Sequence, residues 1–369
     1  MMKALEESTE RMVNARWMRG GTSKCWAFDA EELNSFGIEV DVLLPRIFGS
    51  PDPRQLDGVG GGTSTTSKAL IVERSSDDDC DIIYTFAQVR IDEARVDWGS
   101  NCGNCSAAVG LYAIERGWVE IRGDVTEIRT RNTNTGQIII QSIPTPGGRL
   151  PAEGTETIPG TVFAGHRVDL GFLSPEGMTT GALLPAGEPR TSLAIPERRQ
   201  VTVSLIDAGA PLVMINANDL GLESTEFDRW PSLIEDRLGE LEDFRRSAAE
   251  AMGLASPGEE AERAVPKLGI VGATALPDAD IQVLMLSMGK PHPAMPITGS
   301  VGVTIAALTP ETTVAQALRG PVSDAVRIRI PSGVLKSNVY DRKDGRIVTV
   351  RRTSRTLALA QLPVPNIDD

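Results

Sequence analysis

The sequence predicts a mixed α/β protein made of two similar domains, and three observations favour this class. The chain has 369 residues, enough for about two domains at roughly 150 residues each. Segments typical of strands and of helices are mixed along the whole chain, as in α/β and α+β proteins. The third observation is an order of strands, turns and helices that occurs twice.

The repeat begins with W-M-R-G-G-T-S-K-C-W-A-F-D-A-E-E-L at 17–33 and L-I-D-A-G-A-P-L-V-M-I-N-A-N-D-L at 205–220. Both read as a strand, a glycine turn and a second strand, and each is followed much later by a helix of small residues. We interpret the repeat as two homologous halves that face each other; chance similarity between glycine-rich and alanine-rich stretches stays the alternative. The predicted domains are 11–190 and 195–355, with a tail at 356–369 that packs back on the first domain.

In the first half, strands are predicted at 13–18, 68–72, 82–89 and 94–98, with a pair at 125–129 and 137–143. The residues 19–21 form the first turn. Helices are predicted at 30–35, 41–48 and 104–117, because apolar residues recur at helical spacing and glycine follows the last two. The segment 144–160, rich in Pro, Gly and Thr, is predicted to be a surface loop.

In the second half, 187–200 carries prolines and charges and is the predicted linker. The longest helical pattern is amphipathic and covers 232–253. Strands follow at 267–272 and 280–287, and a helix of small residues at 299–308. Two last strands are predicted at 325–330 and 346–352, the second preceded by a K-D-G turn that indicates a hairpin.

Composition limits the classes of partner. The net charge is −13, whereas a nucleic-acid partner needs a basic face. No apolar run approaches the ~20 residues of a membrane helix, and the acidic, polar start does not resemble a signal peptide. Four cysteines are too few for a disulfide scaffold, so we expect reduced thiols and a cytoplasmic location. The charge does not exclude a small anionic substrate, because a few local cations or helix N-termini can bind an anion, and a homodimer stays open.

The stretch D-W-G-S-N-C-G-N-C-S-A-A-V-G at 97–110 holds two cysteines three apart. We consider four interpretations of these cysteines: a redox pair, part of a metal site, two buried packing residues, or one catalytic thiol. No second C-x-x-C is present, and the chain has two histidines, His166 and His292, too few for a multi-histidine metal site. We therefore expect no metal.

The catalytic-thiol reading assigns different roles to the neighbours of Cys102. Cys102 precedes a predicted helix, whose free N–H groups and dipole should lower the pKa of the thiol and bind an anion. Gly103 allows close backbone approach, Asn104 can cap the helix, and Cys105 then points into helix packing.

Two further stretches carry candidate chemistry. The run G-V-G-G-G-T-S-T-T-S-K at 58–68 is not a phosphate loop, because no glycine precedes Lys68. Lys68 opens the apolar strand K-A-L-I-V, where burial favours a neutral amine that can act as a base; a structural lysine at a strand edge is the alternative. His292, held between two prolines, is a candidate wall of a substrate site, and His166 is treated as structural.

Several motifs together resemble the PrpF family. They are R-G-G-T-S-K (19–24), G-S-P-D-P-R-Q-L-D-G (49–58), T-S-K (66–68), Y-T-F-A-Q-V (84–89), V-D-W-x-x-N-C-G-N (96–104), R-N-T-N-T-G (131–136) and G-x-P-H-x-x-x-x-x-T-G (289–299). The similarity runs from about residue 16 to 355, in one order. The family contains 2-methylaconitate cis–trans isomerase, 3-methylitaconate Δ-isomerase, 4-oxalomesaconate tautomerase and aconitate isomerases.

The resemblance implies a diaminopimelate-epimerase-like fold, in which two domains each wrap a largely antiparallel curved sheet around a central helix. It also implies proton transfer on an unsaturated di- or tricarboxylic acid without a cofactor. The family's lysine falls on Lys68 and its cysteine on Cys102. Expected contacts with substrate carboxylates are Arg19, Ser23, Lys24, Thr63, Ser64, Gly103, Asn104, His292, Thr298, Gly299 and Ser300.

Two departures and two rival functions accompany the resemblance. Two-thiol epimerases of this fold carry a second cysteine before the T-G of the second half, but 294–297 reads A-M-P-I, which disfavours a two-base racemase. Cys25-Trp26 stands where small residues are more usual and leaves the substrate open. The rivals are a thiol redox protein using Cys102 and Cys105, and a carboxylate-binding protein without catalysis.

Overall fold

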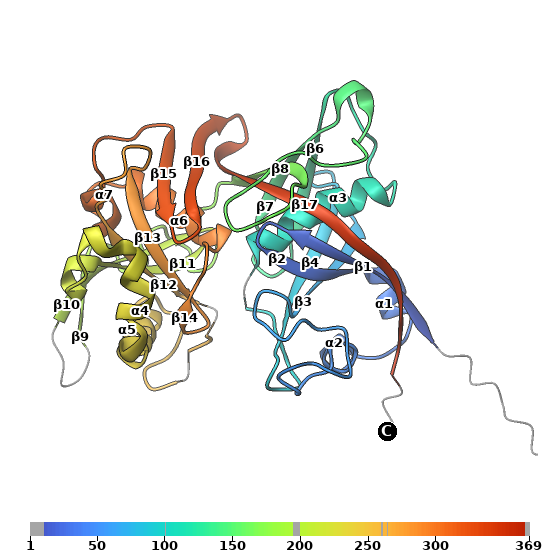
Figure 1. Ribbon diagram of the computed structural model, residues 1–369, viewed down its shortest axis with the longest axis horizontal. Helices are drawn as coiled ribbons and strands as arrows, with labels where there is room; N and C mark the ends of the chain where they lie inside the picture. Colours follow the sequence, from blue (N-terminus) through green and yellow to red (C-terminus); the bar gives the residue numbers. More distant parts are fainter. Residues whose placement is uncertain (1–10, 100, 195–199, 260, 264, 366–369) are drawn as a thin grey trace, which may run out of the picture.

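The structure is a computed structural model that describes residues 11–99, 101–194, 200–259, 261–263 and 265–365. Parts of the predicted linker (195–199) and of the predicted tail (366–369) lie outside these residues. Two α/β halves lie side by side and share one long strand, β17 (Gly345–Pro363) (Figure 1).

The first half is a closed sheet. Its strands are β1 (Met12–Gly20), β2 (Ser23–Asp29), β3 (Lys68–Arg74), β4 (Ile82–Val89), β5 (Val96–Asp97), β6 (Val125–Asn132), β7 (Ile138–Pro144) and β8 (His166–Leu173). β17 closes the ring, because it pairs with β8 through 347–354 and with β1 through 354–363. The helices are α1 (Ala30–Asn34), α2 (Val40–Phe48) and α3 (Gly103–Glu115), with a 3-10 turn at Pro146–Gly148.

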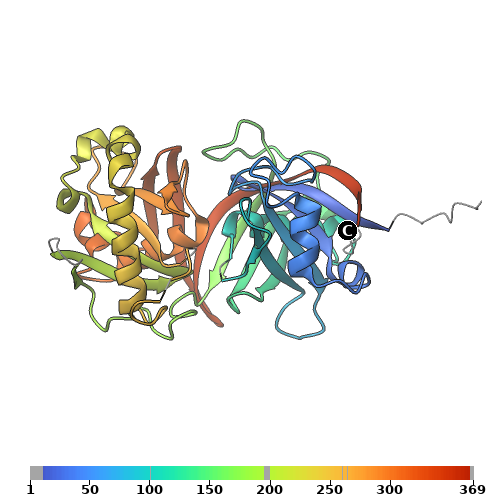
Figure 2. The same cartoon turned by 90° about the horizontal axis from the view of Figure 1, so that it is seen from below.

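The second half repeats this strand order around a central helix, but among its described residues no strand pairing closes the sheet. Its strands are β9 (Thr191–Ala194), β10 (Gln200–Ala208), β11 (Ala210–Asn216), β12 (Lys267–Gly272), β13 (Ile281–Ser287), β14 (Lys290–Pro291), β15 (Ala325–Ile330) and β16 (Gly333–Arg342), which pairs with the start of β17. Its helices are α4 (Trp230–Leu233), α5 (Leu238–Ala251), α6 (Ile297–Leu308) and α7 (Thr313–Ala317), with 3-10 turns at Ala217–Leu220, Ser224–Arg229 and Glu235–Arg237. Figure 2 shows α5 on the outside of this half and β17 crossing between the halves.

One helix fills the centre of each half. In α3 every residue from Gly103 to Ile114 is buried, and in α6 every residue from Ile297 to Ala307. A helix that is apolar or small on all sides has no face for water and must be surrounded. The buried amide of Gln141 in β7 is paired with α3: it accepts from Gly110 N–H (3.0 Å) and donates to the Ser106 carbonyl (2.9 Å). The predicted fold of two similar halves, each wrapped around a central helix, is confirmed.

The structure differs from the predicted elements at several places. The predicted linker 187–200 contains β9, which pairs with β10, and the helix predicted at 299–308 begins at Ile297. The strand predicted at 13–18 continues to Gly20, so the first turn is at Gly21 and Thr22. The helix predicted at 232–253 is broken before Leu238, where the Arg237 guanidinium donates to the Leu220 carbonyl (2.6 Å). The strand predicted at 346–352 runs on to Pro363, because β1 supplies a partner that lies far away in the sequence.

The tail predicted at 356–369 is, through Pro363, the end of β17, which lies along β1 of the first half. Over the described residues, no helix is long and apolar enough to cross a membrane.

Candidate active site

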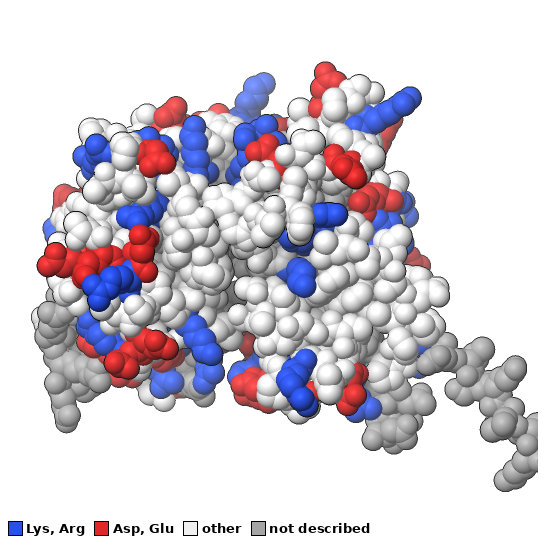
Figure 3. Space-filling view, in the orientation of Figure 1, with Lys and Arg blue, Asp and Glu red and all other residues white. Residues whose placement is uncertain are grey.

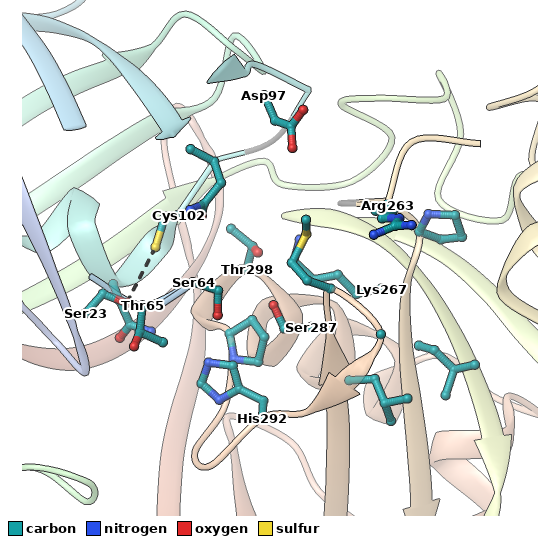
Figure 4. Close-up of a pocket in the computed structure, with 18 of the residues that line it drawn as sticks. Ser23, Ser64, Thr65, Asp97, Cys102, Arg263, Lys267, Ser287, His292 and Thr298 are labelled. Atoms are coloured by element: carbon teal, nitrogen blue, oxygen red, sulfur yellow. Dashed lines mark hydrogen bonds between the residues drawn. The ribbon is translucent and has the colours of Figure 1, made fainter. Parts of the chain in front are cut away.

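A cavity lies at the interface between the two halves, where α3 and α6 begin. We call it the central cavity. The first half contributes Ser23, Ser64, Thr65, Lys68 and the start of α3, and the second half contributes Lys267, Ser287, His292 and the start of α6 (Figure 4). In the space-filling view a narrow gap runs between the halves, and acidic and basic side chains are interspersed around it (Figure 3).

Lys68 is the first residue of β3 and is 7% exposed. Its ammonium donates to Gln88 Oε1 and lies 5.0 Å from the centre of the Phe86 ring. The Gln88 side chain is itself oriented, because its Nε2 donates to the Ser67 carbonyl (2.9 Å). The lysine is therefore held in one position between an oriented amide and an aromatic ring.

The G-S-P-D-P-R-Q-L-D-G motif (49–58) contacts the loop that precedes this lysine. Gln55 is 2% exposed; its Nε2 donates to Ser67 Oγ (2.7 Å) and its Oε1 accepts from Gly62 N–H (2.9 Å). Ser67 Oγ in turn donates to the Val89 carbonyl (2.8 Å). The motif thus fixes the loop that leads into Lys68.

Cys102 is the N-cap residue of α3, and its sulfur lies 4.0 Å from Ser23 Oγ. A hydrogen bond with the Cys105 thiol, followed by burial, raises the pKa of the Cys102 thiol well above its ordinary value. The Lys68 charge and the Cys105 N–H lower this pKa, but by less. This corrects the sequence-based expectation of a lowered pKa: in the described pocket, burial beside a second thiol outweighs the helix start, and Cys102 is protonated at neutral pH.

Cys105 is fully buried and carries a free thiol, as does each of the other three cysteines. Its position inside α3 packing agrees with the expectation for this residue. Asn101, which the motifs did not single out, lines the cavity and is 6% exposed. It donates to Tyr84 OH (3.0 Å) and accepts from Ser106 Oγ (3.1 Å), so it ties the segment before Cys102 to the core.

His292 is neutral and has a defined tautomer. Its Nδ1 accepts from the Ala294 N–H (3.0 Å), which places the proton of a neutral ring on Nε2. Burial first, and then the charges of Lys68, Arg352 and Lys267, lower the pKa of His292 to about 4. The ring can therefore donate one hydrogen bond to an anion without carrying charge.

The starts of α3 and α6 meet directly. A Cβ on Gly103 would lie 2.8 Å from Ile297 Cβ and 3.3 Å from the Thr298 nitrogen. At Gly21, with φ +51°, a Cβ would lie 2.1 Å from Asn104 Oδ1. The glycines allow the strand turn and both helix starts to converge, which brings helix N-termini to one anion-binding region.

Of the thirteen residues expected in the site, eight line the central cavity: Ser23, Ser64, Lys68, Cys102, Gly103, Asn104, His292 and Thr298. Five do not, and each has another place in the structure.

Arg19 donates to the Gly21 carbonyl (2.9 Å) and Thr353 Oγ1 (2.8 Å), so it joins β1 to β17. Lys24 lies on the opposite face of β2 from Ser23, with its ammonium 5.2 Å from the centre of the Trp17 ring. Thr63 Oγ1 bonds Thr66 Oγ1 (2.7 Å) on an exposed loop.

The other two lie inside α6. Ser300 Oγ donates to the Ile297 carbonyl (2.7 Å), and Gly299 is buried in helix packing, where a Cβ would lie 3.3 Å from the Met285 methyl carbon. Consecutive residues at the start of a helix point in different directions around its axis, so only some of them can face the cavity. Gly299 and Ser300 face the interior of the second half instead.

The motif reasoning missed other lining residues, above all Gln88, Asp97, Asn101, Arg263, Lys267 and Ser287. For Lys267 the sequence does hold a signal. K-L-G-I-V in the second half matches K-A-L-I-V in the first, a lysine opening an apolar strand.

Among the described residues, Asp77, Asp79 and Cys80 lie close enough together to share a metal ion. They sit away from the central cavity, on the loop after β3. Arg131 pairs with Asp77 (2.6 Å) and with Asp79, so both carboxylates already face a cation.

Comparisons with known proteins agree with the geometry. The family model described as "PrpF protein" matches residues 10–364. The chain is 36% identical to 2-methyl-aconitate isomerase of Shewanella oneidensis over 88% of each chain. It is 37% identical to 4-oxalomesaconate tautomerase of Pseudomonas putida over 86% of each chain. A crystal structure of methylitaconate-delta-isomerase superposes with a TM-score of 0.80 and 30% identity, covering 97% of this chain and 96% of that one.

Proposed function

The chain belongs to the PrpF family and is an isomerase, and from this premise we propose that it moves a proton within an unsaturated di- or tricarboxylic acid. The acid is of the aconitate, methylaconitate, methylitaconate or oxalomesaconate type. The relatives named for such substrates match nearly the whole chain. The scheme needs no cofactor.

One observation carries the proposal: Lys68 and Cys102, from different elements, line one cavity between the halves. The first offers an amine that can accept a proton, and the second a thiol that is protonated at neutral pH. A base and an acid are what a transfer of one proton between two carbons requires.

In the proposed mechanism, the Lys68 ammonium first gives a proton to solvent, and the resulting amine removes a proton from the carbon that lies next to the C=C bond. The electron pair of the broken C–H bond spreads through the allyl system onto a carboxylate as a dienolate. N–H groups at the starts of α3 and α6 and the Nε2–H of His292 stabilise that charge. The Cys102 thiol gives its proton to the other end of the allyl system, and the Lys68 ammonium then returns a proton to the thiolate.

The same intermediate accounts for both reactions of the family. In the dienolate the former double bond has single-bond character and can rotate. Reprotonation at the first carbon after rotation gives cis–trans isomerisation, whereas protonation at the other end moves the double bond. The substrate's shape in the cavity decides between them.

The experiment is an NMR screen of the purified protein in D2O with cis-aconitate, trans-aconitate, 2-methylaconitate, methylitaconate and 4-oxalomesaconate. We expect turnover of at least one acid, with deuterium at an allylic carbon. The positions of deuterium and of the double bond identify the reaction. If none of the five acids is converted and none exchanges, the proposed function is wrong.

A further inference from the structure

The two halves repeat one strand order, and the repeat can be followed residue by residue. In the first half β1 and β2 form a hairpin, β3 lies parallel to β2, and β4 lies antiparallel to β3. In the second half β10 and β11 form the hairpin, with β12 parallel to β11 and β13 antiparallel to β12. In both, a fully buried helix follows: α3 or α6.

Lys68 and Lys267 occupy the same position of this repeat. Each is the first residue of the third strand, β3 or β12. Lys68 is opposite Gln88, and the register Gly269↔Met285 continues to place Lys267 opposite Ser287. Gln88 and Ser287 both line the central cavity. The lysine side chains therefore enter one cavity from its two sides.

The hairpins confirm that the positions are equivalent. Ser23 and Ala210 are the first residues of the second hairpin strand after the turns at Gly21 and Gly209. Two residues further along come Cys25 and Leu212. Leu212 pairs with Lys267, and the pair Trp26↔Ala69 places Cys25 beside Lys68.

The charges around Lys267 favour an anion there. Burial first, and the positive charge of Lys68, lower the pKa of Lys267 to about 8, so the amine is still mostly protonated at pH 7. The nearby Glu242 carboxylate is paired with Arg245 (2.7 Å) within the cavity wall. Asp97, Arg263 and the neutral His292 complete the titratable lining.

The second half has no thiol at the position equivalent to Cys102. The N-cap of α3 is Cys102, but the N-cap of α6 is Pro296, which has no proton to give. The repeat has thus kept the lysine in both halves and the thiol in one.

We propose that Lys267, as an ammonium, binds a substrate carboxylate on the second-half side of the central cavity, across from the amine of Lys68. This inference rests on the proposed function, since it assumes a carboxylate substrate. One half then supplies the proton-transfer pair and the other the charge that orients the acid. Lys267 is a specificity-determining residue: an unsaturated acid without a carboxylate at that end loses this contact.

The test measures binding of cis-aconitate and trans-aconitate by titration calorimetry at pH 7, with deuterium exchange measured in parallel. The variants are Lys267→Met and Lys267→Arg, and the control is Lys290→Met, which removes an exposed lysine of β14 outside the cavity lining. We expect Kd to rise at least tenfold in Lys267→Met. Lys267→Arg should recover part of the loss because it keeps the charge, and the control should bind as the wild type does.

Thermal unfolding without ligand separates lost binding from lost folding. Lys267→Met should still unfold in one cooperative transition at pH 7, and the aconitates should raise its Tm less than they raise that of the wild type. Unchanged Kd in Lys267→Met overturns the inference. If Kd is unchanged and deuterium exchange is lost, Lys267 is a proton-transfer group and not a binding residue, and the proposed function still stands. If the wild type binds and converts none of the carboxylates, the proposed function fails and this inference with it.

Discussion

The Cys102 thiol holds its proton at neutral pH, and this gives it the role of an acid in the proposed mechanism. Its pKa is raised by the neighbouring Cys105 thiol and by burial. Cys105 contributes through this contact and through packing, because it is fully buried in α3. The two thiols therefore have different roles although they are three residues apart.

Cys102→Ser should lower kcat on the order of 10²-fold or more, since a serine hydroxyl is a far weaker acid than a thiol. Cys105→Ala should keep most of the activity. Steady-state kinetics of both variants on the acid identified by NMR check this. Equal loss in both variants would favour a thiol pair and thereby the redox alternative.

His292 makes folding stability depend on pH. The pKa is about 4 in the folded protein and 6.5 in an unfolded chain, so between these values the unfolded chain binds a proton that the folded protein does not. Stability should therefore fall as pH drops from 6.5 towards 4, by as much as about 3 kcal/mol. Urea unfolding across this range should show a flatter dependence for His292→Asn, which cannot titrate. The same slope in both proteins would contradict a buried neutral histidine.

At the scale of elements, the meeting of α3 and α6 sets the shape of the cavity. Gly103 leaves room for Ile297 at this contact. Both helices are made of small and apolar residues, so they can be buried on all sides and still bring their N-termini together.

Gly103→Ala should push the helix starts apart, because its Cβ would lie 2.8 Å from Ile297 Cβ. We expect KM to rise and kcat to fall several-fold. The matched control is Gly239→Ala in α5, where nothing lies within 4 Å and the helix should gain up to about 1 kcal/mol. Full activity in Gly103→Ala would mean that the helix contact does not shape the site.

Helices and strands with a clear local sequence pattern could be predicted from the sequence. The bounds of the others depend on tertiary contacts. The spacing of Ala107, Ala108 and Leu111 indicates α3, and Lys68 and Cys102 follow from family motifs whose positions the fold brings together. The break before Leu238 and the full length of β17 depend on partners distant in sequence, which no local pattern encodes. Lys267 was missed because the match of K-L-G-I-V to K-A-L-I-V is short, and the strand register is what establishes its equivalence to Lys68.

At the scale of the whole molecule, β17 makes the two halves one unit. It begins beside β16 of the second half, pairs with β8, and ends along β1, where it closes the first sheet. The central cavity has walls from both halves, so its geometry depends on this shared strand.

The closing segment should be needed for stability. Leu362 is 6% exposed and pairs with Val13. Leu362→Ala should lower the free energy of unfolding by about 2–4 kcal/mol, because it removes buried apolar surface and leaves a cavity. Leu359 is 70% exposed on the same strand, so Leu359→Ala should change the free energy of unfolding little. Denaturant unfolding of both variants checks this. A similar decrease in the free energy of unfolding in both variants would show that burial of the β17 side chains does not stabilise this end of the first half.

The central claim is that Lys68 takes the proton that the reaction moves. The most direct measurement is the rate at which solvent deuterium enters the substrate in D2O, compared between the wild type and Lys68→Met. We predict allylic deuterium with the wild type, and loss of both exchange and turnover in a Lys68→Met protein that unfolds at an unchanged Tm. Exchange and turnover at the wild-type rate in Lys68→Met would contradict the account.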